Sequence, residues 1–316
     1  GENTTVSDCT FDNCTAIQGG IIYVQGNNTK VDNATCGNSS ATKYGGAFYI
    51  YGVNATISNS SVENTNATLS GGAIYIDGIN ADIEDSSFEK TNAFGSTTND
   101  GGGAIFIKGD LASVDRSNFT DNGANSNNAK GGAIYITGEN VNVTDSKFEN
   151  SKSKLYGGAI YIHGTNTTIR DSNFTKTSVD GSNSQGGAIY VDGINATIIG
   201  SEFEECSAVV NGGAVYIHGE NTTVQDSDFN KDSVSSSTSN GGAIYVDGIN
   251  AKIIGSEFDE CSAKQQGGSI FIKGANTNIT GSNFTKSYIS ADTSSARGGA
   301  IYVDGQKTTI AKSEFE

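Results

Sequence analysis

Apolar and polar residues alternate along short stretches that recur throughout the chain. In the segment Gly186–Ala208, Ile189 and Val191 flank the aromatic Tyr190, and Phe203 lies between two glutamates. A period of two is typical of β-strands, and the 3.6-residue period of a helix is not visible. The pattern predicts three short strands in this segment, AIYV, ATI and SEF, with the aliphatic residues and the phenylalanine facing inward and Tyr190 facing outward.

The same segment recurs at Gly241–Ala263 with two differences in twenty-three residues, and weaker copies fill the chain. Eleven copies begin with a Gly-Gly pair, at Gly19, Gly45, Gly71, Gly102, Gly131, Gly157, Gly186, Gly212, Gly241, Gly267 and Gly298. The copies are 26 to 31 residues long, and every insertion precedes a Gly pair. A repeat of this length made of short strands predicts an all-β chain that forms one parallel β-helix solenoid over residues 1–316, of about eleven coils.

Stacked coils place equivalent residues above one another at about 4.8 Å, which gives a rod of roughly 50 Å. The main predicted core ladder is Phe11, Cys36, Val62, Phe88, Phe119, Phe148, Phe174, Phe203, Phe229, Phe258, Phe284 and Phe315. A Gly-x-Asn turn in nine copies predicts an asparagine ladder, with breaks at Leu111 and Lys307.

A second aromatic column runs through the first strand of every copy. It comprises Tyr23, Tyr49, Tyr75, Phe106, Tyr135, Tyr161, Tyr190, Tyr216, Tyr245, Phe271 and Tyr302. Alternation puts these rings on the outer face, where such a long aromatic stripe is unusual for an isolated soluble protein. Three interpretations remain open: the chain's own long loops cover the stripe, a partner or a second rod covers it, or it stacks against carbohydrate.

Beside this stripe lies a polar column: Asp77, Lys108, Thr137, His163, Asp192, His218, Asp247, Lys273 and Asp304. A carbohydrate-cleaving β-helix would place its acids and bases on such a face. Because the same residue types recur with no local departure from the repeat, we expect a solvated face, no catalytic residue and no enzymatic activity. The cysteines lack zinc spacing and the calcium-binding nonapeptide is missing, so no metal site and no cofactor are expected either.

Composition limits the partners. Asp and Glu outnumber Lys and Arg by 35 to 19, for a formal net charge of −16, which disfavours nucleic acid and anionic membranes. No apolar run is long enough to span a membrane, and GENTTVSDC at the start does not resemble a signal peptide. The chain starts and stops within a repeat, so we expect a segment of a longer repeat protein or one unit of a fibre.

The recurring GGAI tetrapeptide and the downstream Phe resemble the repeats of the polymorphic outer-membrane proteins, GGA(I/L/V) and FxxN, and related adhesin-like proteins. GGAI begins at seven of the Gly pairs, whereas FxxN occurs only at Phe119–Asn122. The resemblance implies a right-handed parallel β-helix, surface display or secretion, and adhesion, and it supplies no catalytic residue.

Asn-x-Ser/Thr sequons number sixteen, about twice the chance expectation. Asn-rich and Thr-rich columns also create sequons without any sugar. The best glycan candidates are those predicted to face outward: Asn118, Asn142, Asn173, Asn278 and Asn283.

Together these features predict an extracellular or cell-surface structural or adhesive glycoprotein, a stiff rod that assembles with other copies end to end or laterally into filaments, or that binds surface ligands. The alternative is a carbohydrate-binding or carbohydrate-cleaving β-helix.

Overall fold

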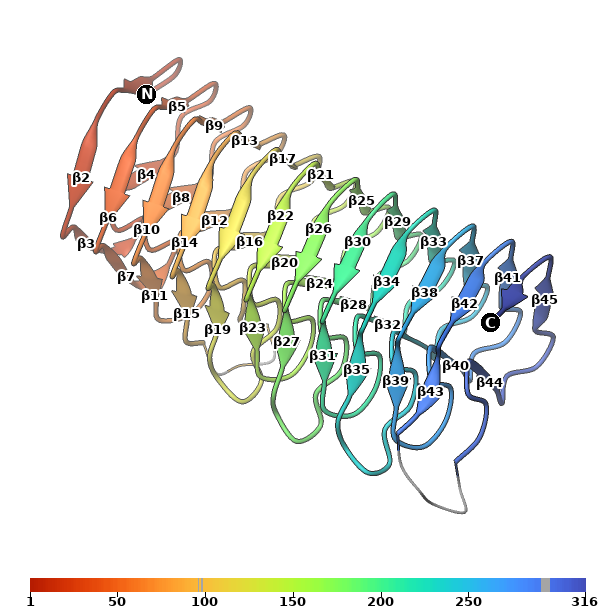
Figure 1. Ribbon diagram of the computed structural model, residues 1–316. Coiled ribbons are helices and arrows are strands. Elements are labelled where there is room, and N and C mark those ends of the chain that lie inside the picture. The colour runs from red at the N-terminus through yellow and green to blue at the C-terminus, as the bar shows by residue number, and fades with distance from the viewer. Residues whose placement is uncertain (96, 98, 291–295) are drawn as a thin grey trace.

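The computed structural model describes residues 1–95, 97, 99–290 and 296–316. These residues form a straight rod of stacked coils with the two termini at opposite ends (Figure 1). Their strands make four sheets, of 12, 12, 11 and 11 strands, and all neighbouring strands are parallel. The predicted all-β parallel β-helix of about eleven coils is confirmed.

Sheets A and B follow the turn after the Gly-x-Asn motif. Sheet A contains β1 (Thr5–Ser7), β5 (Lys30–Asp32), β9 (Thr56–Ser58), β13 (Asp82–Glu84), β17 (Ser113–Asp115), β21 (Asn142–Thr144), β25 (Thr168–Arg170), β29 (Thr197–Ile199), β33 (Thr223–Gln225), β37 (Lys252–Ile254), β41 (Asn278–Thr280) and β45 (Thr309–Ala311). Sheet B contains β2 (Thr10–Asp12), β6 (Thr35–Gly37), β10 (Ser61–Glu63), β14 (Ser87–Glu89), β18 (Asn118–Thr120), β22 (Lys147–Glu149), β26 (Asn173–Thr175), β30 (Glu202–Glu204), β34 (Asp228–Asn230), β38 (Glu257–Asp259), β42 (Asn283–Thr285) and β46 (Glu314–Phe315).

Sheets C and D complete each coil. Sheet C contains β3 (Thr15–Gln18), β7 (Ser40–Tyr44), β11 (Asn66–Ala67), β15 (Asn92–Ala93), β19 (Gly123–Ala124), β23 (Lys152–Ser153), β27 (Ser178–Val179), β31 (Ser207–Ala208), β35 (Ser233–Val234), β39 (Ser262–Ala263) and β43 (Tyr288–Ile289). Sheet D contains β4 (Ile22–Val24), β8 (Phe48–Ile50), β12 (Ile74–Ile76), β16 (Ile105–Ile107), β20 (Ile134–Ile136), β24 (Ile160–Ile162), β28 (Ile189–Val191), β32 (Val215–Ile217), β36 (Ile244–Val246), β40 (Ile270–Ile272) and β44 (Ile301–Val303).

The prediction of three strands per coil is wrong, because sheet C supplies a fourth. Most of its strands are only two residues long, as in Ser207–Ala208 of β31. Two residues are too few to display an alternating pattern, so the sequence gives no sign of this sheet.

Like residues stack on like throughout the core. Phe203 pairs in register with Phe174 and Phe229, and the ring centroids lie 4.9 and 4.7 Å apart. Cys36 and Val62 continue the column in the early coils, as predicted. Stacked rings and buried area contribute about 2 to 3 kcal/mol per buried side chain. The predicted core ladder is therefore confirmed from Cys36 to Phe284, whereas at the two ends of the column Phe11 is half-buried and Phe315 is 54% exposed.

The asparagine ladder is also present. Asn195 has φ +59°, donates from Nδ2 to Oδ1 of Asn166 at 3.0 Å and accepts from Nδ2 of Asn221 at 3.1 Å. The ladder is interrupted at Leu111, which keeps the same left-handed backbone, with φ +59°, and is 51% exposed. Asparagine tolerates this conformation because its short amide bonds locally, whereas leucine has no such compensation.

The Gly pair is required by the contact between coils. Gly186 has φ +69°, and a Cβ on Gly187 would lie 1.9 Å from the carbonyl oxygen of Gly213 in the next coil. A side chain at the second position would therefore push two coils apart.

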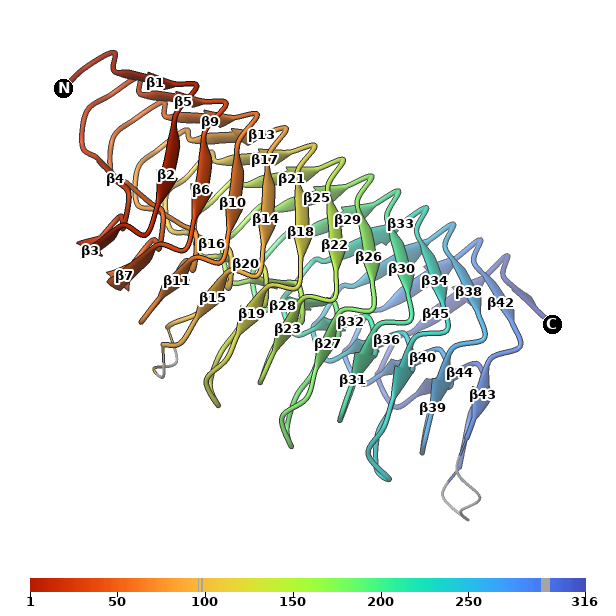
Figure 2. The ribbon, with the colours of Figure 1, turned by 60° about the vertical axis from the view of Figure 1, so that its left-hand side comes forward.

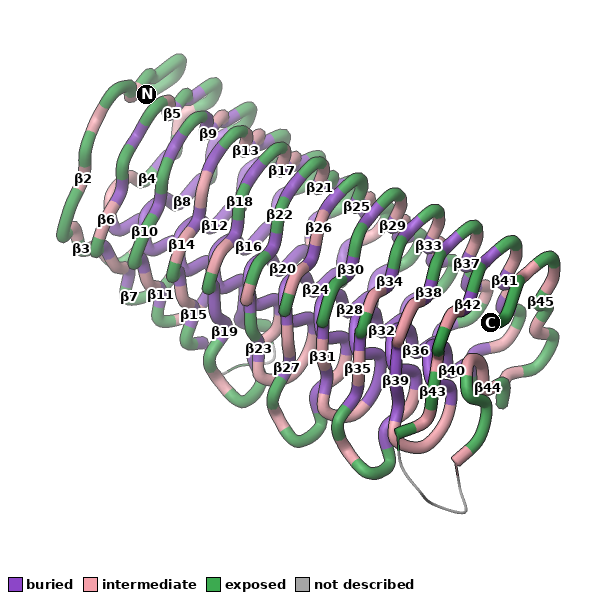
Figure 3. Tube along the Cα trace, in the orientation of Figure 1, coloured by how far each residue is buried: buried purple, intermediate pink, exposed green. Residues whose placement is uncertain are grey.

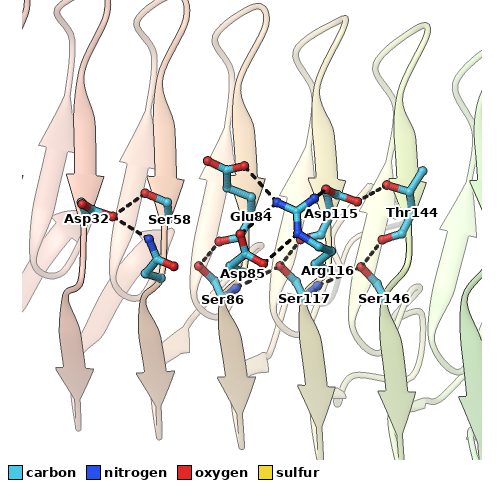
Figure 4. A network of polar contacts seen from close by, with 11 residues as sticks. Asp32, Ser58, Glu84, Asp85, Ser86, Asp115, Arg116, Ser117, Thr144 and Ser146 are labelled. Carbon is cyan, nitrogen blue, oxygen red and sulfur yellow. Dashed lines mark hydrogen bonds and ion pairs between the residues drawn. The ribbon is translucent and has the colours of Figure 1, made fainter.

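A serine column closes the turn between sheets A and B. Ser117 Oγ donates to the carbonyl of Asp115 at 2.9 Å and accepts the Ser86 N–H at 3.3 Å. Outside this column, Arg116 binds Asp85 at 2.8 Å and Glu84 at 3.2 Å and also contacts Asp115 (Figure 4). All four side chains of this cluster are partly exposed, so it stabilises the turn only modestly.

Another buried column lies where sheet B turns into sheet C. Cys206 and Cys261 occupy it as free thiols, with no solvent exposure. The coil between them places Asp232 in the same column, also fully buried, and the carboxyl Oδ2 has no hydrogen-bond partner among the described residues. The pattern of apolar positions does not predict this buried aspartate.

The long loops that are described in full, such as the one after β27, leave the rod along one edge, between sheets C and D (Figure 2). In the middle of the rod the strands of sheet D are buried, whereas most exposed residues lie in turns and loops (Figure 3). The residues immediately before the Gly pairs form a ladder of single parallel bridges, such as Lys130 with Tyr156 and Tyr156 with Gln185. This ladder runs beside sheet D. Among the described residues, no helix is long and apolar enough to cross a membrane.

Candidate functional site on sheet D

The aromatic stripe lies on the outer face of sheet D but is not open to solvent. Nine of its eleven rings are only 2–9% exposed, and they form an apolar cluster separate from the main core. Only Tyr23, at 48%, is exposed, and Tyr302 is half-buried. Neighbouring rings along the stripe lie 4.7 to 5.4 Å apart. An exposed stripe for carbohydrate stacking is therefore not what the fold presents.

The chain itself covers the stripe, through the residues that precede the Gly pairs. Tyr156 lies 4.3 Å from the ring of Tyr190, and Tyr44 lies 4.7 Å from the ring of Tyr75. Alternation correctly placed the tyrosines outside the main core. It could not show that the bridge ladder folds back against them.

The polar column follows the stripe along the rod and carries alternating charges. Lys108 lies 2.6 Å from Asp77, and Lys273 lies 2.8 Å from Asp247. Burial alone would raise the pKa of Asp247, but the hydrogen bond and charge of Lys273 and the nearby His218 outweigh it and lower that pKa. The column is thus a ladder of ion pairs.

The middle of the column brings four functional groups together. The Asp192 carboxylate accepts the Tyr161 hydroxyl at 2.9 Å and lies 3.0 Å from Nδ1 of His163. Lys130 reaches in from the bridge ladder: its Nζ donates to the Tyr161 hydroxyl at 3.4 Å and lies 4.5 Å from the centre of that ring. We call Lys130, Tyr161, His163 and Asp192 the sheet D cluster. His218, on the far side of Asp192, is 4.0 Å from its carboxylate.

Lys130 distinguishes the electrostatics of this cluster from those of the described repeats around it, whereas the raised tyrosine pKa recurs at Tyr216 beside Asp247. Burial lowers the pKa of the Lys130 ammonium, opposed by the charge of Asp192. Burial and the Asp192 carboxylate raise the pKa of the Tyr161 hydroxyl. A lysine that releases its proton more easily, a tyrosine and a carboxylate–histidine pair can between them accept and donate protons. Groups with perturbed pKa values also mark functional sites, although structural ion pairs perturb them too.

A groove of about 420 Å³ adjoins the cluster along the same face. Its floor includes Tyr75, Phe106 and Tyr135, and its far end reaches Thr137 and His163. The loop before Gly102 forms one wall through Asp100, which is buried and accepts the Ser70 hydroxyl at 3.3 Å. A polar groove that follows an extended sheet suits an extended polymer with hydroxyl groups.

The sequence-based interpretation of this face was incomplete. It named His163, Asp192 and His218 but found no departure from the repeat at which a unique site could form. Lys130 is that departure, because the bridge position holds other residues in the neighbouring described coils, such as Ser70, Tyr156 and Gln185. The residue before each Gly pair differs between coils, and this difference is the feature of the sequence that could have pointed to the site.

The remaining predicted features lie elsewhere. Asn118, Asn142 and Asn283 are exposed, and Asn173 and Asn278 are half-buried; all five lie on sheets A and B, away from sheet D. Among the described residues, no group of three or more His, Cys, Asp or Glu side chains is placed to hold a metal ion.

Comparison with known proteins places the fold. The model of the right-handed β-helix region matches residues 132–315, more than half of the chain. The chain belongs to the right-handed β-helix family. The finer resemblance to the polymorphic outer-membrane repeats is not confirmed. A search of curated proteins finds no match.

Two solved structures with this β-helix fold are informative. The periplasmic alginate epimerase AlgG is 11% identical with a TM-score of 0.57, and the match covers 93% of this chain and 76% of that one. PfbA, a surface adhesin of Streptococcus pneumoniae, is 12% identical with a TM-score of 0.51, covering 96% and 82%. At these identities the likeness shows the shared fold alone.

These comparisons correct the expectation that the β-helix chain is not an enzyme. An alginate epimerase has the same fold. The expectation rested on repeat regularity, and a regular β-helix is compatible with catalysis. The sheet D cluster supplies the local irregularity that the expectation took to be missing.

Proposed function

We propose that this protein binds an extended polysaccharide along sheet D, in the cell envelope or outside the cell, and acts on it by proton transfer at the sheet D cluster. The observation that carries the proposal is the convergence of Lys130, Tyr161, His163 and Asp192 beside a polar groove. Support for the location comes from similar folds described as periplasmic or surface proteins.

Each group has a role that follows from its contacts. The Asp192 carboxylate orients the Tyr161 hydroxyl and the His163 ring, because both lie within about 3 Å of it. Lys130 is half-buried and contacts the other side of that hydroxyl. His163 can accept a proton, because the neighbouring Asp192 carboxylate stabilises the imidazolium that forms, and Lys130, whose pKa is lowered, can donate one. A proton acceptor and a proton donor at one place are the requirement for general acid–base catalysis.

The test combines binding and conversion. The protein is incubated with a panel of polysaccharides, and both retention on the polymer and new chain ends or altered sugars are measured. We expect Asp192→Asn and Lys130→Met to lower conversion by about 100-fold, within the usual range for a group that transfers protons. The matched controls Asp226→Asn and Lys147→Met, exposed on the opposite side of the rod, should leave it unchanged. Absence of binding to every polymer would overturn the proposal.

Adhesion is the second candidate function. The observation that favours it is an exposed apolar corner between sheets D and A, where Tyr51, Val53, Ile79 and Leu111 are 39–54% exposed. Binding without conversion, reduced by Tyr51→Ser and unaffected by Asp192→Asn, would favour adhesion. Assembly into filaments and covalent glycans belong to this same proposal of a surface rod.

A further inference from the structure

The charges on sheet D narrow the class of polysaccharide. Among the described residues of this face, the protein itself neutralises two lysines, Lys108 by Asp77 at 2.6 Å and Lys273 by Asp247 at 2.8 Å. The His163 ring, which is a cation only when protonated, lies 3.0 Å from Asp192. His218 lies between two carboxylates, 4.0 Å from Asp192 and 3.4 Å from Asp247. A ligand carboxylate would therefore have to displace a carboxylate of the protein to gain a cation.

Lys130 is the exception, since no carboxylate lies within ion-pair distance of it in the described part of the chain. Its ammonium is held instead by the faces of three tyrosines, with centroids at 5.9, 5.9 and 4.5 Å for Tyr135, Tyr156 and Tyr161. These ring contacts stabilise the cation and direct it toward the protein. One enclosed ammonium cannot match a polymer that carries a carboxylate on every sugar.

The net charge of the whole chain also disfavours an anionic polysaccharide. The formal net charge is −16, so the whole rod repels a polyanion before contact is made. The ligand-facing groups that remain are acceptors and hydroxyls, such as the partly exposed carboxylates of Asp77 and Asp192 and the Thr137 side chain at the groove. Carboxylates form strong hydrogen bonds with hydroxyl donors, which every neutral sugar supplies.

We propose that the ligand of sheet D is an uncharged polysaccharide, built of neutral hexoses or N-acetylated hexosamines, and not a polyuronate. This inference rests on the proposed function and adds the substrate class to it. It also separates this chain from the folds described as alginate enzymes, because alginate is a polymer of uronic acids.

The experiment compares four immobilised polymers: a β-glucan, a galactomannan and chitin on the neutral side, and polymannuronate on the anionic side. We expect the wild-type chain to bind at least one neutral polymer about tenfold more tightly than polymannuronate, and this binding to change little between low and high salt. Tighter, salt-sensitive binding to polymannuronate would overturn the substrate class and leave the proposed function standing. Binding to none of the four, nor to a wider panel, would overturn the proposed function itself.

A double variant that removes two of the paired carboxylates tests whether they prevent binding of an anionic polymer. Asp77→Asn with Asp247→Asn keeps the side-chain shapes and frees Lys108 and Lys273 from their carboxylates. We expect this double variant to gain about tenfold in affinity for polymannuronate. The control Asp171→Asn with Asp226→Asn makes the same change in net charge at exposed turns between sheets A and B. An equal gain in the control would attribute the effect to net charge and overturn the role of the paired cations.

Discussion

Replacing Asp232 with asparagine should stabilise the rod. Burial raises the pKa of the Asp232 carboxyl well above its ordinary value, and Oδ1 accepts the Cys206 N–H at 2.8 Å while Oδ2 lacks a partner. In the same column, another coil carries an asparagine whose side-chain oxygen and nitrogen both have hydrogen-bond partners. Asn122 accepts from the Thr91 N–H at 3.1 Å and donates from Nδ2 to the Phe88 carbonyl at 3.1 Å.

The magnitude follows from the unsatisfied oxygen. A buried polar atom without a partner costs about 1 to 3 kcal/mol, so Asp232→Asn should raise the free energy of unfolding by about that amount at pH 7. An aspartate whose pKa is raised in the folded state stabilises the fold below the unfolded pKa of about 3.9 and loses this contribution as the pH rises toward the folded pKa. The advantage of the variant should therefore be smallest near pH 4 and grow toward pH 8.

Urea denaturation followed by circular dichroism at pH 4.5, 6 and 8 measures this difference. The reciprocal variant Asn122→Asp is the matched control, since it should create the same penalty with the same dependence on pH. A gain for Asp232→Asn that is equal at all three pH values, or a loss of stability at pH 8, would refute the reasoning.

Two further predictions concern the outside of the rod. Leu111→Asn should restore the broken ladder between Asn80 and Asn140 and raise the free energy of unfolding by about 1 to 2 kcal/mol in urea, whereas Leu111→Ala, which restores no hydrogen bond, should give no gain. If the sequons are used, native material should exceed its peptide mass by several kilodaltons in intact mass spectrometry, and Asn118→Gln should remove one glycan's worth of that excess; a mass equal to the peptide mass would exclude glycosylation.

Much of the fold could be predicted because a repeat displays the same physical constraint eleven times. Phe203 alone is one apolar residue. The equivalent position is apolar in all eleven copies of the repeat and lies at a fixed distance from the Gly pair, which specifies a stacked core. The asparagine ladder was predictable for the same reason. Sheet C was not, because a two-residue strand such as β31 is defined only by its neighbours in space.

The site was less accessible to sequence reasoning. His163 and Asp192 could be placed on one face from the repeat register. Lys130 could not, because it belongs to the variable segment, and its contact with Tyr161 depends on how that segment closes against sheet D. When each column is described by the residue type that most coils share, a single different residue such as Lys130 is not noticed. Asp232 could not be predicted for the same reason, because it is a single charged residue in an otherwise small or neutral buried column.

The confinement of every insertion to the edge between sheets C and D separates two kinds of change. The spacing of 17 positions from Gly186 to Phe203 sets the register of three sheets, and the equivalent spacing is the same in every coil. The segment that differs in length lies beside the groove and the sheet D cluster. Loops can therefore be exchanged or lengthened one coil at a time without disturbing a core ladder. Evolution, or a protein engineer, can alter recognition and leave mechanical stiffness constant.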